Sequence, residues 1–175
     1  MNIPNLLSIS RILFLAPIII FFEYNFYLIS LLTFVVASLT DYLDGYLARK
    51  NKLTSDLGSL LDPLADKIFV SILLIWMTFN FQELIILISS ILIVSREISI
   101  SYLRLFFISK SKNLKEVKSD LIGKSKTAFQ MTGLGLLIIS PLTSDIFLNT
   151  SLILVFLSAV LSWYSFIIYL NKWIV

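Results

Sequence analysis

Apolar residues fill six long stretches of the chain, and short polar segments separate these stretches. A helix needs about 17 to 25 mostly apolar residues to cross the hydrocarbon core of a membrane. The stretches approach or reach this length, although the first and the fifth are short and adjoin polar residues. We therefore expect six transmembrane helices. They cover residues 6–22, 27–48, 57–79, 84–107, 127–141 and 148–170.

A charge interrupts the first stretch, because Arg11 lies near its beginning and the fully apolar part starts only at Ile12. Residues 1–11 are therefore expected at the membrane surface, as a short interfacial helix that begins after Pro4. Together the segments predict an all-α integral membrane protein that folds as a single domain over residues 1–175.

Composition narrows the class of protein and the kinds of chemistry. Hydrophobic residues make up 58% of the 175 residues, and the mean hydropathy is +0.92, which is too apolar for an ordinary soluble domain. The chain has no histidine and no cysteine. A classical zinc site, a cysteine nucleophile and a histidine general base are therefore excluded.

Basic residues gather at alternate ends of the predicted helices. The connections near Glu23, Glu83 and Asp145 contain no lysine or arginine, whereas the opposite ends are basic. The basic residues at those opposite ends are Arg49, Lys50, Lys52, Lys110, Lys112, Lys115, Lys118, Lys124, Lys126 and Lys172. By the positive-inside rule, both termini and the basic connections face the cytoplasm. This topology explains the basic charge, so nucleic-acid binding has no support.

Four carboxylates stand out within the apolar pattern: Asp41, Asp44, Asp62 and Asp66. A carboxylate in hydrocarbon is costly unless it is paired or bound to a metal. On a helix, Asp41 and Asp44 lie about 60° apart and Asp62 and Asp66 about 40° apart, so two adjacent helices can present all four to one point. Such a group suits two hard divalent cations, Mg²⁺ or Mn²⁺.

Small and cationic residues accompany these acids. Gly45 and Gly58 have no side chain, which lets a ligand approach the backbone closely. Arg49 follows Gly45 by about one turn and can hold an anionic ligand there. The sequence around the acids therefore predicts a metal site beside an anion site.

Eight positions in this region have the spacing D-x-x-D-G-x-x-A-R-x8-G-x-x-x-D-x-x-x-D. The pattern resembles the signature of the CDP-alcohol phosphatidyltransferases, integral membrane enzymes that make phospholipids. The resemblance implies that the metal ions are held by Asp41, Asp44, Asp62 and Asp66, with Asp66 also acting as general base. It implies that the nucleotide is bound by Asp41, Gly45, Ala48, Arg49 and Gly58.

Pro63 leaves two possible starts for the third helix. Either Asp62 caps a helix with Pro63 at its first position, or the helix begins at residues 54–56 and Pro63 lies in its interior. The family resemblance favours the second alternative, which places Gly58, Asp62 and Asp66 on one stripe.

The resemblance extends over residues 2–11, 95–104 and 123–131 to the bacterial members that make phosphatidylglycerophosphate, with Ser8 where a threonine is usual. Those members join CDP-diacylglycerol to sn-glycerol 3-phosphate and release CMP. The resemblance implies that Asp66 deprotonates the 1-hydroxyl of the acceptor, which then attacks the β-phosphorus while the metals stabilise the departing CMP. It also implies a homodimer in the bacterial inner membrane.

Three basic residues are candidates for binding the phosphate of the acceptor: Arg96, Arg104 and Lys126. Arg96 and Arg104 share a helix face, and guanidinium groups suit phosphate. The alternative is that Arg96 pairs with an acid while Arg104 extends to the interface. Glu97 is expected to point elsewhere and to neutralise a neighbour. Either Lys124 or Lys126 faces the cavity, because periodicity does not distinguish them.

Other functions compete with this interpretation. The same chemistry with phosphatidylglycerol, serine or an inositol phosphate as acceptor is the nearest alternative. A cation transporter would use the acids as an ion site, but it leaves Gly45, Arg49 and Gly58 unexplained. A membrane scaffold without activity is disfavoured because every acid of the signature is present.

Overall fold

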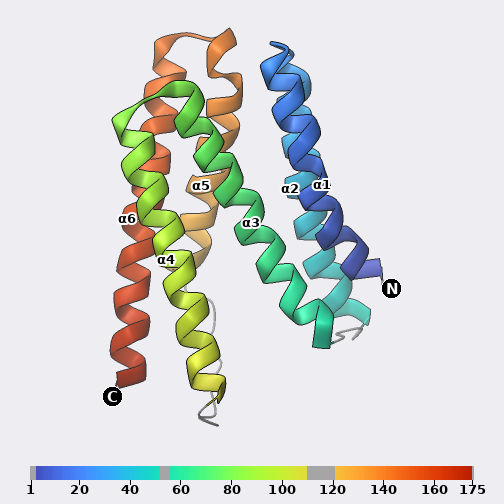
Figure 1. Ribbon diagram of the computed structural model, residues 1–175, viewed down its shortest axis with the longest axis vertical. Coiled ribbons are helices and arrows are strands. Elements are labelled where there is room, and N and C mark those ends of the chain that lie inside the picture. The colour runs from blue at the N-terminus through green and yellow to red at the C-terminus, as the bar shows by residue number, and fades with distance from the viewer. Residues whose placement is uncertain (1–2, 52–55, 110–120, 175) are drawn as a thin grey trace.

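A computed structural model describes residues 3–51, 56–109 and 121–174 of the chain, and the side chains of residues 10–40, 64–103 and 125–171 (Figure 1). The described residues are almost entirely helical and contain no strand. The elements are α1 (Ile3–Glu23), α2 (Tyr27–Asn51), α3 (Asp56–Phe81), α4 (Leu84–Ser109), α5 (Leu121–Ile139), the 3-10 helix η1 (Ser140–Leu142) and α6 (Asp145–Ile174). The predicted all-α fold, with six long helices in the predicted order, is confirmed.

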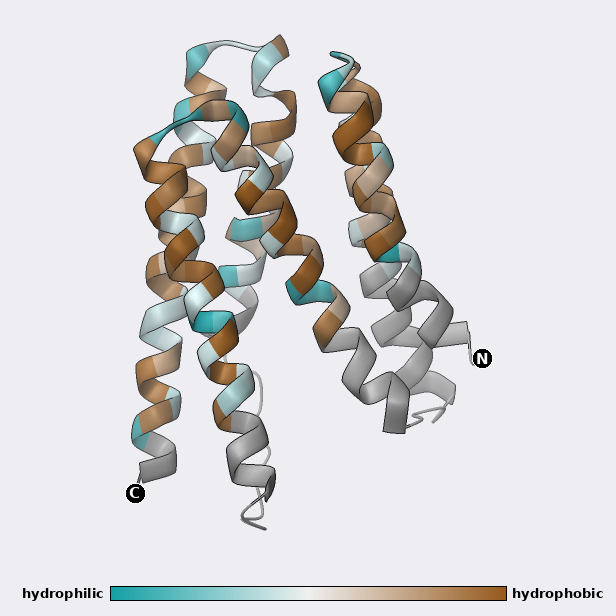
Figure 2. Cartoon of the chain, in the orientation of Figure 1, coloured by the Kyte–Doolittle hydropathy of each residue, from teal (hydrophilic) through white to brown (hydrophobic). Residues whose placement is uncertain are grey.

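The outer surface of these helices is apolar, as a membrane requires. Figure 2 shows hydrophobic residues along most of each coloured helix, with hydrophilic residues at the turns and at a few positions between them. Among the described residues, three segments are long and apolar enough to cross a membrane: Leu64–Phe81, Leu84–Leu103 and Asp145–Asn171. A shorter apolar segment covers Tyr27–Thr40. Helices suit this environment because each satisfies its own backbone hydrogen bonds.

The helices run up and down, so that the two chain ends lie at the same end of the bundle (Figure 1). The end of α2, the start of α3, the end of α4 and the start of α5 lie at this end as well. The opposite end holds the short turns at residues 24–26, 82–83 and 143–144. This arrangement puts the basic ends of the helices together and the three acidic turns together.

Two helix starts answer questions that the sequence left open. The helix α1 continues from Ile3 past Arg11 to Glu23, so the expected interfacial segment forms the beginning of α1 rather than a helix of its own. Residues 5–16 contain no glycine or proline to end a helix, and Pro4 is tolerated in a first turn. The helix α3 begins at Asp56 and includes Pro63, as the second alternative expected.

The helix α3 links the two halves of the bundle. It packs against α1 on one side and α4 on the other, while α2 contacts α5 and both α4 and α5 pack against α6. Figure 1 shows α3 running obliquely between the α1–α2 pair and the other helices. The fully buried side chains of α3 are Phe69, Leu73, Leu74 and Met77. Their burial holds α3 at a fixed position, which matters because α3 also carries part of the site described below.

At Gly133 the helices α5 and α6 approach each other closely. A Cβ atom added at Gly133 would lie 2.7 Å from Val155 Cγ2 and 3.2 Å from the Val155 backbone nitrogen. Gly135 lies two residues further along and faces α2 instead, where it has more room, because its added Cβ would lie 3.6 Å from Leu31 Cδ1. Gly133 therefore allows the two backbones to pack together, whereas Gly135 does not have that role.

We predict that Gly133→Ala lowers the free energy of unfolding by about 1–3 kcal/mol, the usual cost of overpacking a close contact. Gly135→Ala is the matched control, because both substitutions gain the same helix propensity. The thermal unfolding midpoint of each purified variant in detergent measures the difference. Equal midpoints for the two variants would contradict the close packing of α5 on α6.

Candidate active site

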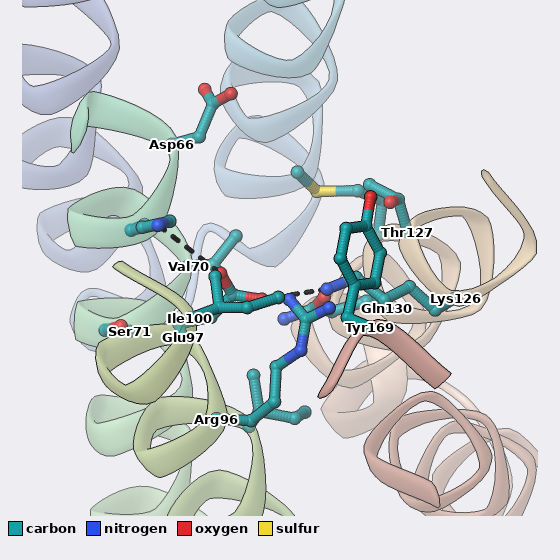
Figure 3. Close-up of a pocket in the computed structure, with 13 residues that line it drawn as sticks. Asp66, Val70, Ser71, Arg96, Glu97, Ile100, Lys126, Thr127, Gln130 and Tyr169 are labelled. Carbon is teal, nitrogen blue, oxygen red and sulfur yellow. Dashed lines mark hydrogen bonds and ion pairs between the residues drawn. The ribbon is translucent and has the colours of Figure 1, made fainter. Parts of the chain in front are cut away.

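A cavity of about 320 Å³ lies among α3, α4, α5 and α6 (Figure 3). Its polar and charged lining comes from all four helices. The lining residues with polar side chains are Asp66, Lys67, Ser71, Arg96, Glu97, Lys126, Thr127, Gln130 and Tyr169. Lys126 lies near the start of α5 and Tyr169 near the end of α6, so the cavity belongs to the half of the bundle nearer the chain termini. That half is also where the signature acids occur along α2 and α3.

Glu97 brings three cations together in this cavity. Arg96 Nη1 and Lys126 Nζ donate hydrogen bonds of 2.7 Å and 2.8 Å to Glu97 Oε1. Lys67 Nζ lies 3.9 Å from Glu97 Oε2. The side chains of Arg96, Glu97 and Lys126 point toward one another in Figure 3. One carboxylate on α4 thus joins cations from α3, α4 and α5, and we call these four residues the Glu97 cluster.

Neutral partners fix the positions of the same cations. Arg96 Nε donates to the Ser162 carbonyl at 3.2 Å, and Lys126 Nζ donates to Ser162 Oγ at 3.3 Å. Lys67 Nζ donates to Ser101 Oγ at 2.5 Å. These hydrogen bonds attach α4 and α5 to α6, and α3 to α4. The cationic groups are therefore held in place by bonds between helices rather than by flexible surface contacts.

The Glu97 cluster combines three cationic side chains with one carboxylate. Buried cations at membrane depth commonly face a polar cavity or bind anions. Guanidinium and ammonium groups are the usual ligands of phosphate. The arrangement of Arg96 and Lys126 in the cavity wall therefore suits a ligand that carries a phosphate.

Asp66 stands at the edge of the cavity, apart from the Glu97 cluster (Figure 3). It forms an ion pair with Arg11, which lies on α1 and is 1% exposed. This pair joins α1 to α3 beside the cavity. Because the Asp66 side chain is 39% exposed, its carboxylate remains accessible from the cavity.

The remaining signature residues occupy the two helix ends next to residues 52–55. Asp41, Asp44, Gly45, Ala48 and Arg49 lie in the last turns of α2, and Gly58 and Asp62 lie in the first turns of α3. Their side chains lie outside the described residues, as does that of Arg104 in α4. Within the described part of the chain no three acidic residues form a metal-binding group. Of the four predicted metal ligands, only Asp66 has a side chain among the described residues.

Two of the three predicted phosphate ligands, Arg96 and Lys126, line the same cavity. Lys126 of α5 therefore faces the cavity, and the side chain of Lys124 lies outside the described residues. The expectation that Glu97 points elsewhere was wrong, because the cavity extends around α4 far enough for both Arg96 and Glu97 to line it, and Lys126 of α5 reaches Glu97 there. The expectation that Glu97 neutralises a neighbour is confirmed by its bond to Arg96.

Sequence reasoning missed Lys67, Ser162 and Tyr169. Lys67 had a signal, since a lysine inside an apolar stretch is costly and therefore calls for a functional or pairing role. Ser162 and Tyr169 had no such signal. Serines and aromatic residues are common along α6, and only the packing of α6 against α4 and α5 selects these two.

Comparisons with known proteins place this geometry in context. The family model for CDP-alcohol phosphatidyltransferase matches residues 1–170. The chain is 38% identical, over 97% of its length and 92% of the relative, to a Haemophilus influenzae CDP-diacylglycerol--glycerol-3-phosphate 3-phosphatidyltransferase. A Salmonella choleraesuis protein of that name is 33% identical, and the match covers 97% of this chain and 93% of the relative. An Arabidopsis thaliana relative, numbered 2 under the same name, is 38% identical, and the match covers 79% of this chain and 64% of the relative.

We predict that Glu97→Gln destabilises the protein, because it removes the carboxylate charge that faces the cationic groups of Arg96 and Lys126. Removing one partner of a buried ion pair costs about 3–5 kcal/mol. The thermal unfolding midpoint in detergent, without added phosphate, measures the effect. Glu83→Gln is the matched control, because Glu83 is an exposed carboxylate just before α4. A Glu97→Gln midpoint equal to that of Glu83→Gln would show that the cluster needs no carboxylate.

Proposed function

Because the chain belongs to the CDP-alcohol phosphatidyltransferase family, we propose that it transfers the phosphatidyl group from CDP-diacylglycerol to sn-glycerol 3-phosphate. The products are phosphatidylglycerophosphate and CMP. Relatives named for this reaction match nearly the whole chain. The observation that carries the proposal is the cavity whose wall contains the cationic groups of Arg96 and Lys126, since the acceptor carries a phosphate and these groups suit it.

The acceptor occupies the cavity with its phosphate on Arg96 and Lys126. Arg104 lies two turns after Arg96 on α4, and we assign it to the same phosphate. The nucleotide of CDP-diacylglycerol is assigned to the helix ends of α2 and α3. Its ligands are Asp41, Gly45, Ala48, Arg49 and Gly58. These assignments put donor and acceptor in the same half of the bundle.

Two divalent ions, Mg²⁺ or Mn²⁺, would be held by Asp41, Asp44, Asp62 and Asp66. The donor set fits such ions, because hard cations prefer carboxylate oxygens and the chain offers no histidine or cysteine. When bound, the ions supply neutralisation of the diphosphate and of the charge that grows on the leaving CMP.

The side chains of this protein position the acceptor and move one proton. Arg96 and Lys126 hold the phosphate, which orients the glycerol part toward the cavity edge where Asp66 lies. Asp66 takes the proton of the 1-hydroxyl, and that oxygen attacks the β-phosphorus of CDP-diacylglycerol. Arg11 contacts Asp66 from α1 and keeps this carboxylate at the cavity edge. No covalent bond to the protein forms.

The protein is a multi-pass membrane protein, and we assign it to the bacterial inner membrane as one domain over residues 1–175. Both termini and the cavity half face the cytoplasm, because the basic helix ends lie together there. We further assign the protein as a homodimer, on the family resemblance. Light scattering in detergent, corrected for bound detergent, would give two protomer masses.

CMP release from CDP-diacylglycerol tests the proposed function. We predict release by the purified protein with glycerol 3-phosphate, and little release with serine, inositol phosphate or phosphatidylglycerol. A chelator should abolish release and Mg²⁺ or Mn²⁺ should restore it. Release with a different acceptor would keep the chemistry but remove the assignment of the cavity. Metal flux into liposomes without CMP release would favour a transporter instead.

Asp66→Asn is the control for the chemical step in that assay. The amide cannot accept the proton, so CMP release should fall by about 10²- to 10⁴-fold, the usual contribution of a general base. Asn149→Asp, at an exposed position near the start of α6 and at the opposite end of the bundle (Figure 1), should keep activity within about twofold, as surface changes usually do. Near wild-type turnover by Asp66→Asn would remove Asp66 as the base.

Labelling of single cysteines tests the orientation, and the chain offers a background without any cysteine. We predict that Glu83→Cys reacts with a membrane-impermeant maleimide in intact spheroplasts, because it lies at an exposed acidic turn. Asn171→Cys, exposed near the other end of the bundle, should react only after the membrane is permeabilised. The reverse pattern would place the cavity half outside the cytoplasm.

A further inference from the structure

We propose that Gln130 is a specificity-determining residue that binds the 2-hydroxyl group of the acceptor. The inference rests on the proposed function, because it concerns the acceptor of that reaction. It goes beyond the assignment of the phosphate to Arg96 and Lys126, since it states which part of the carbon chain the cavity recognises. The argument depends on the burial of Gln130, on its hydrogen bonds and on its place along α5.

The side chain of Gln130 lines the cavity from α5 (Figure 3). Gln130 is only 7% exposed, and the apolar side chains of Val70, Ile93 and Met131 line the same cavity. A carboxamide group in such surroundings is costly unless its polar atoms are hydrogen-bonded. Gln130 therefore needs hydrogen-bond partners, which a glutamine at the surface would find in bulk water.

The fold itself does not supply these partners. Among the residues that the structure describes, none donates a hydrogen bond to the Gln130 amide or accepts one from it. The amide is not enclosed by protein atoms either, because the cavity reaches it. Arg96, Glu97 and Lys126 differ, since hydrogen bonds join them to one another and to α6. The partner of Gln130 therefore comes from the occupant of the cavity, either water or a ligand.

A carboxamide group matches a hydroxyl group better than it matches a phosphate. The amide donates through its nitrogen and accepts through its oxygen, and a hydroxyl group likewise donates and accepts. A phosphate dianion only accepts, and the cationic groups of Arg96 and Lys126 are stronger donors for it than a neutral amide. The chemistry of Gln130 thus points to a hydroxyl group of the ligand.

The spacing of Lys126 and Gln130 indicates which hydroxyl group is bound. The two residues are four positions apart on α5, so their side chains lie on the same face about one turn apart. In glycerol 3-phosphate the 2-hydroxyl is on the carbon next to the phosphate-bearing carbon, whereas the 1-hydroxyl is one carbon further away. A phosphate held by Lys126 therefore brings the 2-hydroxyl toward Gln130. The 1-hydroxyl remains for Asp66 at the cavity edge.

A bond to the 2-hydroxyl gives the acceptor a second fixed point. With its phosphate and its 2-hydroxyl both held, the carbon chain cannot turn freely, and the 1-hydroxyl keeps one direction. An acceptor without the 2-hydroxyl loses this point and leaves the Gln130 amide to water. Because water can replace part of the lost bond, we expect a moderate preference of about tenfold rather than complete rejection.

Equilibrium binding to the purified full-length protein tests the inference without turnover. Isothermal titration calorimetry in detergent compares glycerol 3-phosphate with two analogues. The first is 3-hydroxypropyl phosphate, which lacks the 2-hydroxyl, and the second is 2-hydroxypropyl phosphate, which lacks the 1-hydroxyl. All three ligands keep the phosphate, so Arg96 and Lys126 act on them alike. The variant is Gln130→Met, which keeps an unbranched side chain of similar length without the amide.

Wild-type protein should bind 3-hydroxypropyl phosphate about tenfold more weakly than glycerol 3-phosphate, as loss of one hydrogen bond does. Gln130→Met should weaken glycerol 3-phosphate and 2-hydroxypropyl phosphate about tenfold alike, and 3-hydroxypropyl phosphate less than about twofold. The preference for the 2-hydroxyl therefore disappears, while the preference for the 1-hydroxyl stays. Met131→Leu is the matched control, because Met131 lines the same cavity and the substitution conserves volume. It should leave both preferences unchanged.

Three results overturn the inference. Equal weakening of all three ligands by Gln130→Met would show that the amide only supports the shape of the cavity. Loss of the preference for the 1-hydroxyl instead would show that the amide binds the other end of the acceptor. A wild-type protein that binds 3-hydroxypropyl phosphate as tightly as glycerol 3-phosphate would show that the 2-hydroxyl is not recognised.

CMP release with the same variants separates this inference from the proposed function. Gln130→Met should raise the KM for glycerol 3-phosphate about tenfold, while the KM for CDP-diacylglycerol changes less than about threefold. A preference for the 2-hydroxyl that depends on Gln130, in a protein that releases no CMP with glycerol 3-phosphate, supports the inference and overturns the proposed function. CMP release by a protein that shows no such preference keeps the proposed function and overturns the inference.

Discussion

A charged side chain inside a membrane protein needs a counter-charge or a charged ligand, and this constraint shapes the centre of the bundle. Glu97 meets this need for its neighbours, because its carboxylate accepts hydrogen bonds from Arg96 and Lys126 and lies 3.9 Å from the ammonium group of Lys67. The same side chains line one cavity, so the polar groups inside the bundle are gathered at a single place.

The helix α3 connects this site to the stability of the fold. Its buried residues pack against α1 and α4, and the same helix carries Asp66 and Lys67 next to each other. Asp66 pairs with Arg11 on α1, whereas Lys67 contacts Ser101 on α4. The two neighbouring residues therefore tie α3 to opposite halves of the bundle. A shift of α3 would therefore move Asp66 and Lys67 together.

Close packing elsewhere protects this arrangement. Gly133 lets α5 approach α6, and Ser162 on α6 binds both Arg96 and Lys126. The helix pair behind the cavity therefore holds Arg96 and Lys126, two of the proposed phosphate ligands, in place.

The sequence by itself determined the six helices and their order, because hydrophobic length acts locally along the chain. Only the tertiary structure decided that Glu97 lies at the centre of the cavity, that Lys67 joins it and that Arg11 pairs with Asp66. The reason is physical. Periodicity gives the direction of a side chain around its own helix, whereas a contact depends on which helix packs opposite, and that depends on interactions distant in the chain.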